Sequence, residues 1–128
     1  MKYLLDTHTL LWWVTEPETL SQSLLDFLDD PSNELLLSVA VAWELAIKTN
    51  TGRLDASQLL REIEYGQLKQ DLLVLPAEVA HVIRAGLLPL HHRDPFDRLL
   101  AAQALDLGIA VISRDRIFDR YGVRRVWR

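Results

Sequence analysis

The chain contains no cysteine. That absence excludes disulfide bonds, thiolate metal sites and thiol nucleophiles, and it fits a reducing cytoplasm. The sequence also lacks any apolar run near the roughly 18–20 residues that a membrane-spanning helix needs. The N-terminal stretch MKYLLDTHTLLWWV resembles a signal peptide only faintly, because Asp6 and His8 interrupt it and no small-residue cleavage site follows. We therefore expect a soluble, cytoplasmic protein without a membrane segment.

No linker, repeat or low-complexity segment interrupts the 128 residues. Hydrophobic residues make up 49% of the chain, which is enough for a substantial core. This length suits one domain, so we expect a single domain over residues 1–128.

Net positive charge is also absent, since the formal charge is −4, and this argues against a general binder of polyanions. The charge is nevertheless uneven, because residues 114–128 contain six arginines and only two aspartates. From charge alone, an ordinary solvated C-terminus is the simpler interpretation. A basic strip that holds nucleic acid on an otherwise acidic body is the alternative.

Short apolar runs alternate with helical patterns along the whole chain. Strands are expected at residues 2–5, 34–38, 72–76, 109–113 and 123–127. Helices are expected at residues 7–14, 17–30, 39–51, 56–69, 77–88 and 95–107, with a short helix or turn at 114–122. This order predicts a three-layer α/β/α sandwich with a mostly parallel central sheet. The strands are apolar on both faces, as expected for a sheet that is covered on both sides.

Four carboxylates stand in unusual surroundings. Asp6 and Asp115 each follow a predicted strand, where open α/β sheets gather functional groups, although each also suits the start of a helix or turn. Glu44 is the only polar residue in VAVAWELAI. It is either an exposed partner of Lys48 at the i,i+4 spacing or a buried acid that needs a cation.

The stretch RDPFDRLLAAQA contains the remaining candidates. Asp94 fits a helix N-cap, Pro95 the first helical position and Asp97 the third. Asp97 also lies in the helical row that leads to Leu100 and Ala104, which faces a packed interior. Capping therefore explains Asp94 better than it explains Asp97.

The four acids meet at one edge if the first and fourth strands are neighbours. Clustered carboxylates repel one another and raise their own pKa values unless a divalent cation compensates them. Oxygen ligands without cysteine favour Mg²⁺ or Mn²⁺. Such a site commonly activates water against a phosphodiester, so the pattern predicts phosphodiester hydrolysis.

Four segments now resemble a known family: YLLDTHTLLW, SVAVAWELAIK, HRDPFDRLLAAQA and AVISRDRIFDRYGV. In this order and spacing they resemble the PIN-domain family, in particular the VapC-like toxin ribonucleases of type II toxin–antitoxin systems and their HRDPFDR-containing branch. The resemblance runs from about residue 2 to residue 126.

The resemblance implies a metal-dependent endoribonuclease that takes RNA as substrate. The acidic quartet that binds Mg²⁺ or Mn²⁺ would be Asp6, Glu44, Asp97 and Asp115. Supporting residues would be Asp94, as a cap or support of the third acid, and Thr7 and Ser113, as hydrogen-bond partners of the first and fourth acids or of a metal-bound water. Arg114 and Arg116 would contact the RNA. The family also implies a homodimer and a cognate antitoxin protein whose segment enters the cleft, where a basic side chain could occupy the acidic site.

The histidines and tryptophans are assigned other roles. His8 is expected to pack or to orient the first loop. His91 and His92 are expected in a solvated loop, with a substrate contact as the alternative. Trp12, Trp13 and Trp43 are interpreted as core or interface residues, because base-stacking aromatics usually accompany an exposed basic platform.

Three alternative functions stay open or are disfavoured by particular residues. A non-catalytic PIN-like module that binds RNA or protein stays open, because a sequence does not show turnover. A phosphatase of the haloacid dehalogenase type needs a second acid two residues after the first, where His8 stands. A phospho-receiver domain would have a lysine near its last strand, whereas residues 114–128 carry only arginines as cations.

Overall fold

The computed structural model describes residues 1–68 and 72–128. In this part of the chain, one sheet holds five strands in the order β3-β2-β1-β4-β5, and every neighbouring pair is parallel. The strands are β1 (Lys2–Leu5), β2 (Glu34–Ser38), β3 (Leu72–Leu75), β4 (Ala110–Ile112) and β5 (Arg125–Val126). The predicted parallel sheet is confirmed.

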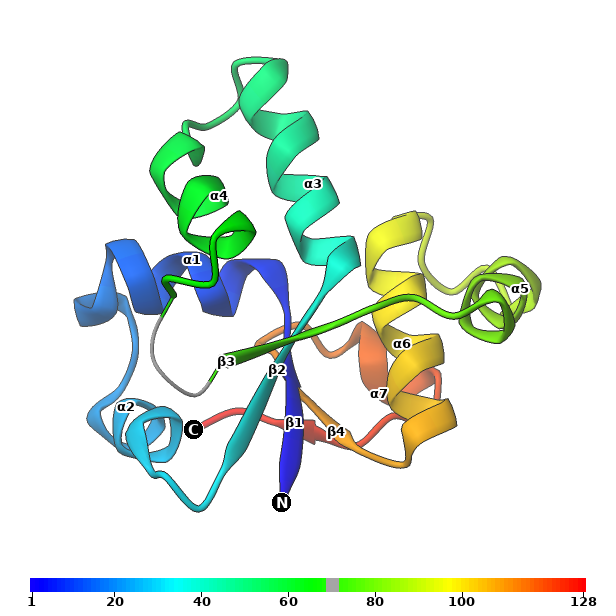
Figure 1. The fold of residues 1–128 in the computed structure, drawn as a ribbon. Coiled ribbons are helices and arrows are strands. Elements are labelled where there is room, and N and C mark those ends of the chain that lie inside the picture. The colour runs from blue at the N-terminus through cyan, green and yellow to red at the C-terminus, as the bar shows by residue number, and fades with distance from the viewer. Residues whose placement is uncertain (69–71) are drawn as a thin grey trace.

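Helices cover both faces of the sheet (Figure 1), with α1, α2 and α4 on one side and α5, α6 and α7 on the other. The helices are α1 (Thr7–Thr15), the short 3-10 helix η1 (Pro17–Thr19), α2 (Gln22–Asp29), α3 (Val39–Asn50), α4 (Ser57–Glu64), α5 (Val79–Leu87), α6 (Pro95–Leu107) and α7 (Ile117–Arg120). None of the described helices is both long and apolar enough to cross a membrane. The architecture is the three-layer sandwich that the alternating pattern predicts.

The central strands β1 and β4 lie side by side, with Leu4 paired to Val111. Both residues are fully buried, because helices cover both faces of these strands. Parallel neighbours end at the same edge of a sheet, so the residues that follow β1 and β4 are brought together there. The first and fourth strands are therefore neighbours, which was the condition for the four acids to meet at one edge.

The helix predicted over residues 17–30 is divided into η1 and α2. Ser21 takes an extended conformation (φ −65°, ψ 155°), and its Oγ accepts a hydrogen bond from Leu24 N at 3.1 Å. Leu20 and Leu28 are buried together with Leu24, so the apolar stripe continues across the break. Periodicity alone could not reveal a break that leaves the buried stripe intact.

The helix predicted over residues 56–69 is shorter in the structure. α4 ends at Glu64, and Gly66 follows with a φ of 65°, a conformation that only glycine adopts readily. The last residue of the predicted helix lies outside the described residues.

Burial of every strand on both faces was also expected, and this is wrong for β3. It lies at the edge of the sheet and pairs only with β2. Leu73 is 54% exposed and Val74 is 49% exposed. Leu72 and Leu75 pack against the core, whereas burial within the described residues does not account for Leu73 and Val74.

The junction between β2 and α3 is fastened by a buried hydroxyl. Ser38 Oγ accepts a hydrogen bond from Ala40 N at 3.1 Å and donates one to Gln103 Oε1 at 2.6 Å. Gln103 Nε2 in turn donates to Pro76 O at 3.2 Å. Ser38 and Gln103 are both fully buried, so this chain of contacts joins β2, α6 and the end of β3.

We expect Ser38→Ala to lower the free energy of unfolding by about 1–3 kcal/mol, because it removes a helix cap and leaves the Gln103 amide without one of its buried partners. Chemical denaturation measures the change. Ser23→Ala, at an exposed position of α2, is the matched control and should change the midpoint little. Equal effects of the two substitutions would contradict the structural role of Ser38.

Candidate active site at the carboxyl edge of the sheet

Asp6 lies between the end of β1 and the start of α1. Its Oδ1 accepts a hydrogen bond from Thr9 N at 2.9 Å, and its Oδ2 accepts one from Ser113 Oγ at 2.5 Å. The side chain is buried at 5% exposure. Burial raises the pKa of Asp6 above its ordinary value, while the hydrogen bonds from Ser113 and Thr9 act in the opposite direction. The first acid is held in place by both neighbouring strand ends.

Asp115 follows β4 and is linked to Asp6 through Ser113. Ser113 Oγ accepts a hydrogen bond from Asp115 N at 3.0 Å while it donates to Asp6. Asp115 Oδ1 accepts from Ile117 N at 2.9 Å, where α7 begins. Asp6 and Asp115 line one cavity of about 230 Å³. The expected hydrogen bond from Ser113 to the first acid is present.

Asp97 stands in the first turn of α6. Asp94 caps this helix, with its Oδ1 accepting from Phe96 N at 2.9 Å and from Asp97 N at 3.4 Å. Burial raises the pKa of Asp97 to about 7, and the negative charges of Asp94 and Asp6 act in the same direction. The charge of Asp6 reaches Asp97, so the acids of α6 and β1 lie in one electrostatic site.

Glu44 is buried in α3 at 3% exposure, with both carboxylate oxygens engaged. Oε1 accepts a hydrogen bond from Thr7 Oγ1 at 2.6 Å, and Oε2 forms an ion pair with Lys48 Nζ. The i,i+4 pair therefore forms, but Glu44 is buried, as the second of its two interpretations required. Thr7 was expected beside the first or fourth acid and instead holds the second. Thr7 follows Asp6 directly and so joins Glu44 to the site.

His92 is a site residue that the sequence interpretation missed. It was expected in a solvated loop, but it is half-buried and its Nε2 lies 2.8 Å from Asp97 Oδ2. This contact lowers the pKa of Asp97 and opposes the effect of burial. His92 N also donates to the Tyr121 hydroxyl at 2.9 Å. Its position two residues before the cap of α6 was the available signal, since a side chain there can fold back onto the first helical turn.

The other assigned residues divide between core and surface. Trp13 lies in the core at 6% exposure, Trp12 is partly buried, and Trp43 is 61% exposed, so Trp43 is not a core residue. Arg114 and Arg116, on either side of Asp115, are both exposed.

The donor set fits a hard divalent cation. Carboxylate oxygens are the ligands that Mg²⁺ and Mn²⁺ prefer. Within residues 1–68 and 72–128, no lysine or arginine forms an ion pair with Asp6, Asp97 or Asp115. Among the described residues, the three potential metal ligands whose ligand atoms lie within 4.8 Å of one another are His92, Asp94 and Asp97. This group contains only one member of the quartet. A divalent cation would neutralise the negative charge of acids that no lysine or arginine pairs within the described residues.

Comparison with known proteins agrees with this geometry. The family model for the PIN domain matches residues 3–124 of this chain. The chain belongs to the PIN-domain family. It is 30% identical over 116 residues to Ribonuclease VapC22 of Mycobacterium tuberculosis, a match that covers 88% of this chain and 86% of that protein.

Solved structures show the same fold. VapBC2 from Rickettsia felis, bound to a DNA fragment from its promoter, matches with a TM-score of 0.72 at 16% identity and covers 100% of both chains. DNA-bound VapBC from Salmonella typhimurium matches with a TM-score of 0.72 at 21% identity and covers 98% of this chain and 97% of that one. Membership of the PIN-domain family leaves the phosphatase and phospho-receiver alternatives without support.

Asp97 generates a stability prediction for the metal-free protein. Its folded-state pKa, about 7, exceeds the ordinary value of 3.8, so the folded state should lose stability as pH rises between these values. We expect Asp97→Asn to raise the Tm above neutral pH, with a gain in the free energy of unfolding on the order of 1 kcal/mol in a site partly open to solvent. Thermal denaturation in a chelating buffer across this pH range measures the effect.

Asp29→Asn, at an exposed position of α2, is the control. It should leave the pH dependence of the Tm unchanged. A Tm that is lowered equally at all pH values in Asp97→Asn would mean that the acid serves the fold.

Proposed function

We propose that the protein is a Mg²⁺- or Mn²⁺-dependent endoribonuclease and the toxin of a toxin–antitoxin pair, built as a single PIN-like domain over residues 1–128. The observation that carries the proposal is the pair Asp6 and Asp97, both with raised pKa values and neither paired with lysine or arginine within the described residues. Supporting it, the mycobacterial relative is named a ribonuclease.

In this proposal Asp6, Glu44, Asp97 and Asp115 hold the metal ion. A bound divalent cation supplies charge neutralisation at a phosphodiester and lowers the pKa of a water molecule. The chain itself supplies orientation. Ser113 and Thr9 fix the two oxygens of Asp6, while the backbone N–H of Ile117 orients Asp115.

The second and third acids have their own supports. His92 holds one oxygen of Asp97, and the cap formed by Asp94 sets the start of the helix that carries Asp97. Thr7 and Lys48 fix Glu44. Such contacts keep negatively charged groups in a fixed arrangement before a cation binds.

The RNA substrate would approach along the arginines beside the site. An acidic cleft repels a phosphate backbone, whereas exposed Arg114 and Arg116 flank Asp115 and attract it. Arg114 also lines the cavity shared by Asp6 and Asp115. The arginines would therefore hold the backbone at the edge of the acidic site.

A cognate antitoxin is the proposed protein partner. The structural neighbours from Rickettsia felis and Salmonella typhimurium are VapBC assemblies. An acidic cleft would accept a basic side chain from such a partner, because a cation would neutralise the same carboxylates that hold the metal.

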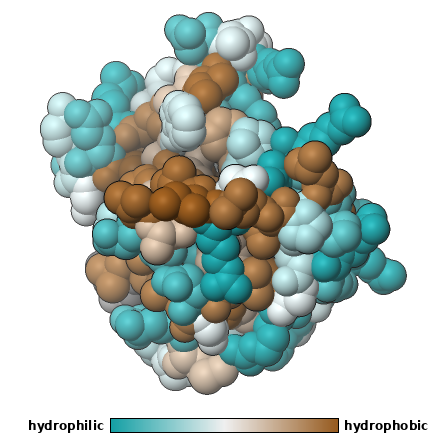
Figure 2. Space-filling view, turned by 90° about the vertical axis from the view of Figure 1, so that its right-hand side faces the viewer, coloured by the Kyte–Doolittle hydropathy of each residue, from teal (hydrophilic) through white to brown (hydrophobic). Residues whose placement is uncertain are grey.

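A second copy of the chain is the proposed occupant of an exposed apolar surface. We call this surface the α3–β3–α5 face, and its large exposed side chains are Trp43, Ile47, Leu73, Val79, Val82, Ile83 and Leu87. Figure 2 shows apolar residues gathered in a band across the side of the molecule where α5 lies. A monomer rarely exposes so many large apolar side chains together, so burial between two copies explains them.

The main alternative function is a non-catalytic PIN-like module that binds RNA or protein. It would use the same fold and the same arginines. It predicts RNA binding without cleavage, so a cleavage assay separates the two functions.

The cleavage assay uses single-stranded and structured RNAs with Mg²⁺, with Mn²⁺ or with a chelator. We expect metal-dependent cleavage by the wild-type protein and a loss of at least about a hundredfold in Asp6→Asn and Asp97→Asn, because each substitution removes a proposed metal ligand. Asp94→Asn is expected to retain far more activity, since an asparagine still caps a helix.

Unchanged cleavage by Asp6→Asn would reveal a contaminating nuclease. RNA binding without cleavage by the wild-type protein would favour the binding module. Equal losses in Asp94→Asn and Asp97→Asn would give Asp94 a place in the metal site with His92 and Asp97.

The dimer is tested with Ile83→Glu, which places a charge on the α3–β3–α5 face at a position that is 56% exposed. We expect the wild-type protein to sediment as a dimer and the variant as a folded monomer, because burying an unpaired carboxylate is unfavourable. Analytical ultracentrifugation with circular dichroism measures both properties. Tyr65→Glu, at an exposed position after α4, is the control; a monomeric wild-type protein would contradict the proposal.

A further inference from the structure

The cavity beside Asp6 and Asp115 has three further lining residues, His8, Trp12 and Arg114. Two aromatic rings and one guanidinium therefore adjoin two of the acids. Unpaired bases of single-stranded RNA are bound by stacking on aromatic side chains and on arginine planes. The acids themselves do not require aromatic neighbours.

The rings are arranged as a platform. His8 and Trp12 are one helical turn apart on α1, with ring centroids 5.6 Å apart and an interplanar angle of 35°. Trp127, from the C-terminal segment, packs beside Trp12, and the centroids of their rings are 6.2 Å apart. Trp12 is thereby fixed between α1 and the C-terminus, while His8 is exposed.

We propose that this cavity is a base-binding subsite, which takes the unpaired base of a nucleotide next to the cleaved bond of single-stranded RNA. The base stacks on the His8–Trp12 pair, and Arg114 contacts the base plane or the adjoining phosphate. This inference rests on the proposed function and adds the residues that select the substrate.

The aromatic lining distinguishes an RNA base from a basic side chain of a protein partner. A divalent cation bound at Asp6 and Asp115 would neutralise these acids, and Arg114 would then attract a ligand that carries a phosphate. The aromatic rings favour a planar ligand. A nucleotide has both properties, so it fits this cavity better than an arginine or lysine does.

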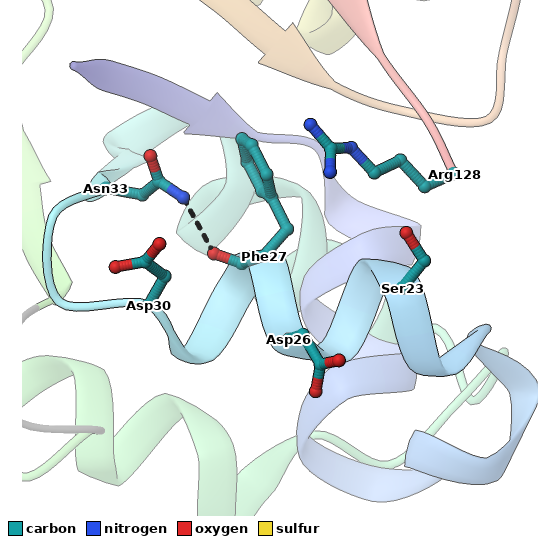
Figure 3. A pocket seen from close by; sticks show the side chains of 6 residues that line it. All are labelled: Ser23, Asp26, Phe27, Asp30, Asn33 and Arg128. Carbon is teal, nitrogen blue, oxygen red and sulfur yellow. Dashed lines mark hydrogen bonds between the residues drawn. The ribbon is translucent and has the colours of Figure 1, made fainter.

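A second pocket also contains an aromatic ring and an arginine, but they are not arranged to bind a base. Figure 3 shows its lining residues, Ser23, Asp26, Phe27, Asp30, Asn33 and Arg128. There the Arg128 guanidinium lies over the Phe27 ring, 4.7 Å from its centroid, and so covers a face that a base would need. Two aspartates line this pocket, but neither belongs to the four acids of the proposed site. The pocket is therefore given no ligand.

The test combines ring substitutions with RNA that lacks single bases. Single-stranded RNA containing the cleaved bond is prepared with an abasic residue at each neighbouring position in turn. For the wild-type protein, one abasic position is expected to lower kcat/KM about tenfold or more, the loss typical of one stacked base. In His8→Ala and Trp12→Ala, the same abasic residue should cause little further loss, because the stacking partner is already absent.

Tyr65→Ala is the matched control, since this exposed aromatic lies outside the cavity lining. It should keep the full effect of the abasic residue. Trp12 packs against Trp127, so Trp12→Ala also removes a contact of α1. His8 is exposed, so His8→Ala is expected to fold normally and keeps the test decisive.

Binding supplies a readout that does not need turnover. In the Asp97→Asn background, fluorescence anisotropy compares intact RNA with the abasic series. We expect about tenfold weaker binding at one abasic position, and no such difference once His8→Ala is added.

Equal binding of intact and abasic RNA would overturn the subsite, whether or not the protein cleaves RNA. Cleavage of all abasic RNAs at the wild-type rate would also overturn it and leave the proposed nuclease standing. A protein that discriminates abasic RNA in binding but cleaves none would keep the subsite and refute the nuclease. Weaker antitoxin binding by His8→Ala, with RNA discrimination unchanged, would assign the cavity to the protein partner and overturn the inference.

Discussion

Burial of carboxylates at one sheet edge is the constraint on which the site depends, because it raises the pKa values of Asp6 and Asp97. Asp6 and Asp97 come from segments far apart in the chain, yet the charge of one raises the pKa of the other. Ser113 and His92 hold them in this position through hydrogen bonds. The metal-free fold therefore carries unfavourable charge that a divalent cation would relieve, which is a cost in stability typical of functional sites.

The pairing of β1 with β4 makes this arrangement possible. It brings Ser113 against Asp6, and Ser113 also bonds the backbone of Asp115. One hydroxyl therefore sets two of the four acids. The other two acids lie on α3 and α6. Thr7 joins α3 to the same edge, and the Asp94 cap sets the start of α6.

Aromatic side chains connect the proposed site with the surfaces around it. On the α3 side, Trp43 meets Phe96 edge-to-face with ring centroids 5.2 Å apart, and Phe96 directly precedes Asp97. A second copy on the α3–β3–α5 face would thus lie close to the start of α6. On the α1 side, His8 and Trp12 line the cavity beside Asp6. The proposed dimer face thus lies near Asp97, and the proposed base subsite is lined by Asp6 and Asp115.

The sequence by itself determined the order of elements and several of the helix ends. Ser38 and Asp94 cap their helices, and Gly108 ends α6 with a φ of 66°, because capping and chain reversal depend on a few adjacent residues. Family resemblance likewise rests on local segments. Only the tertiary structure decided that Glu44 is buried against Thr7 and that the charge of Asp6 acts on Asp97. Burial and the pKa shifts that follow it are produced by segments distant in the chain, and no local pattern encodes those contacts.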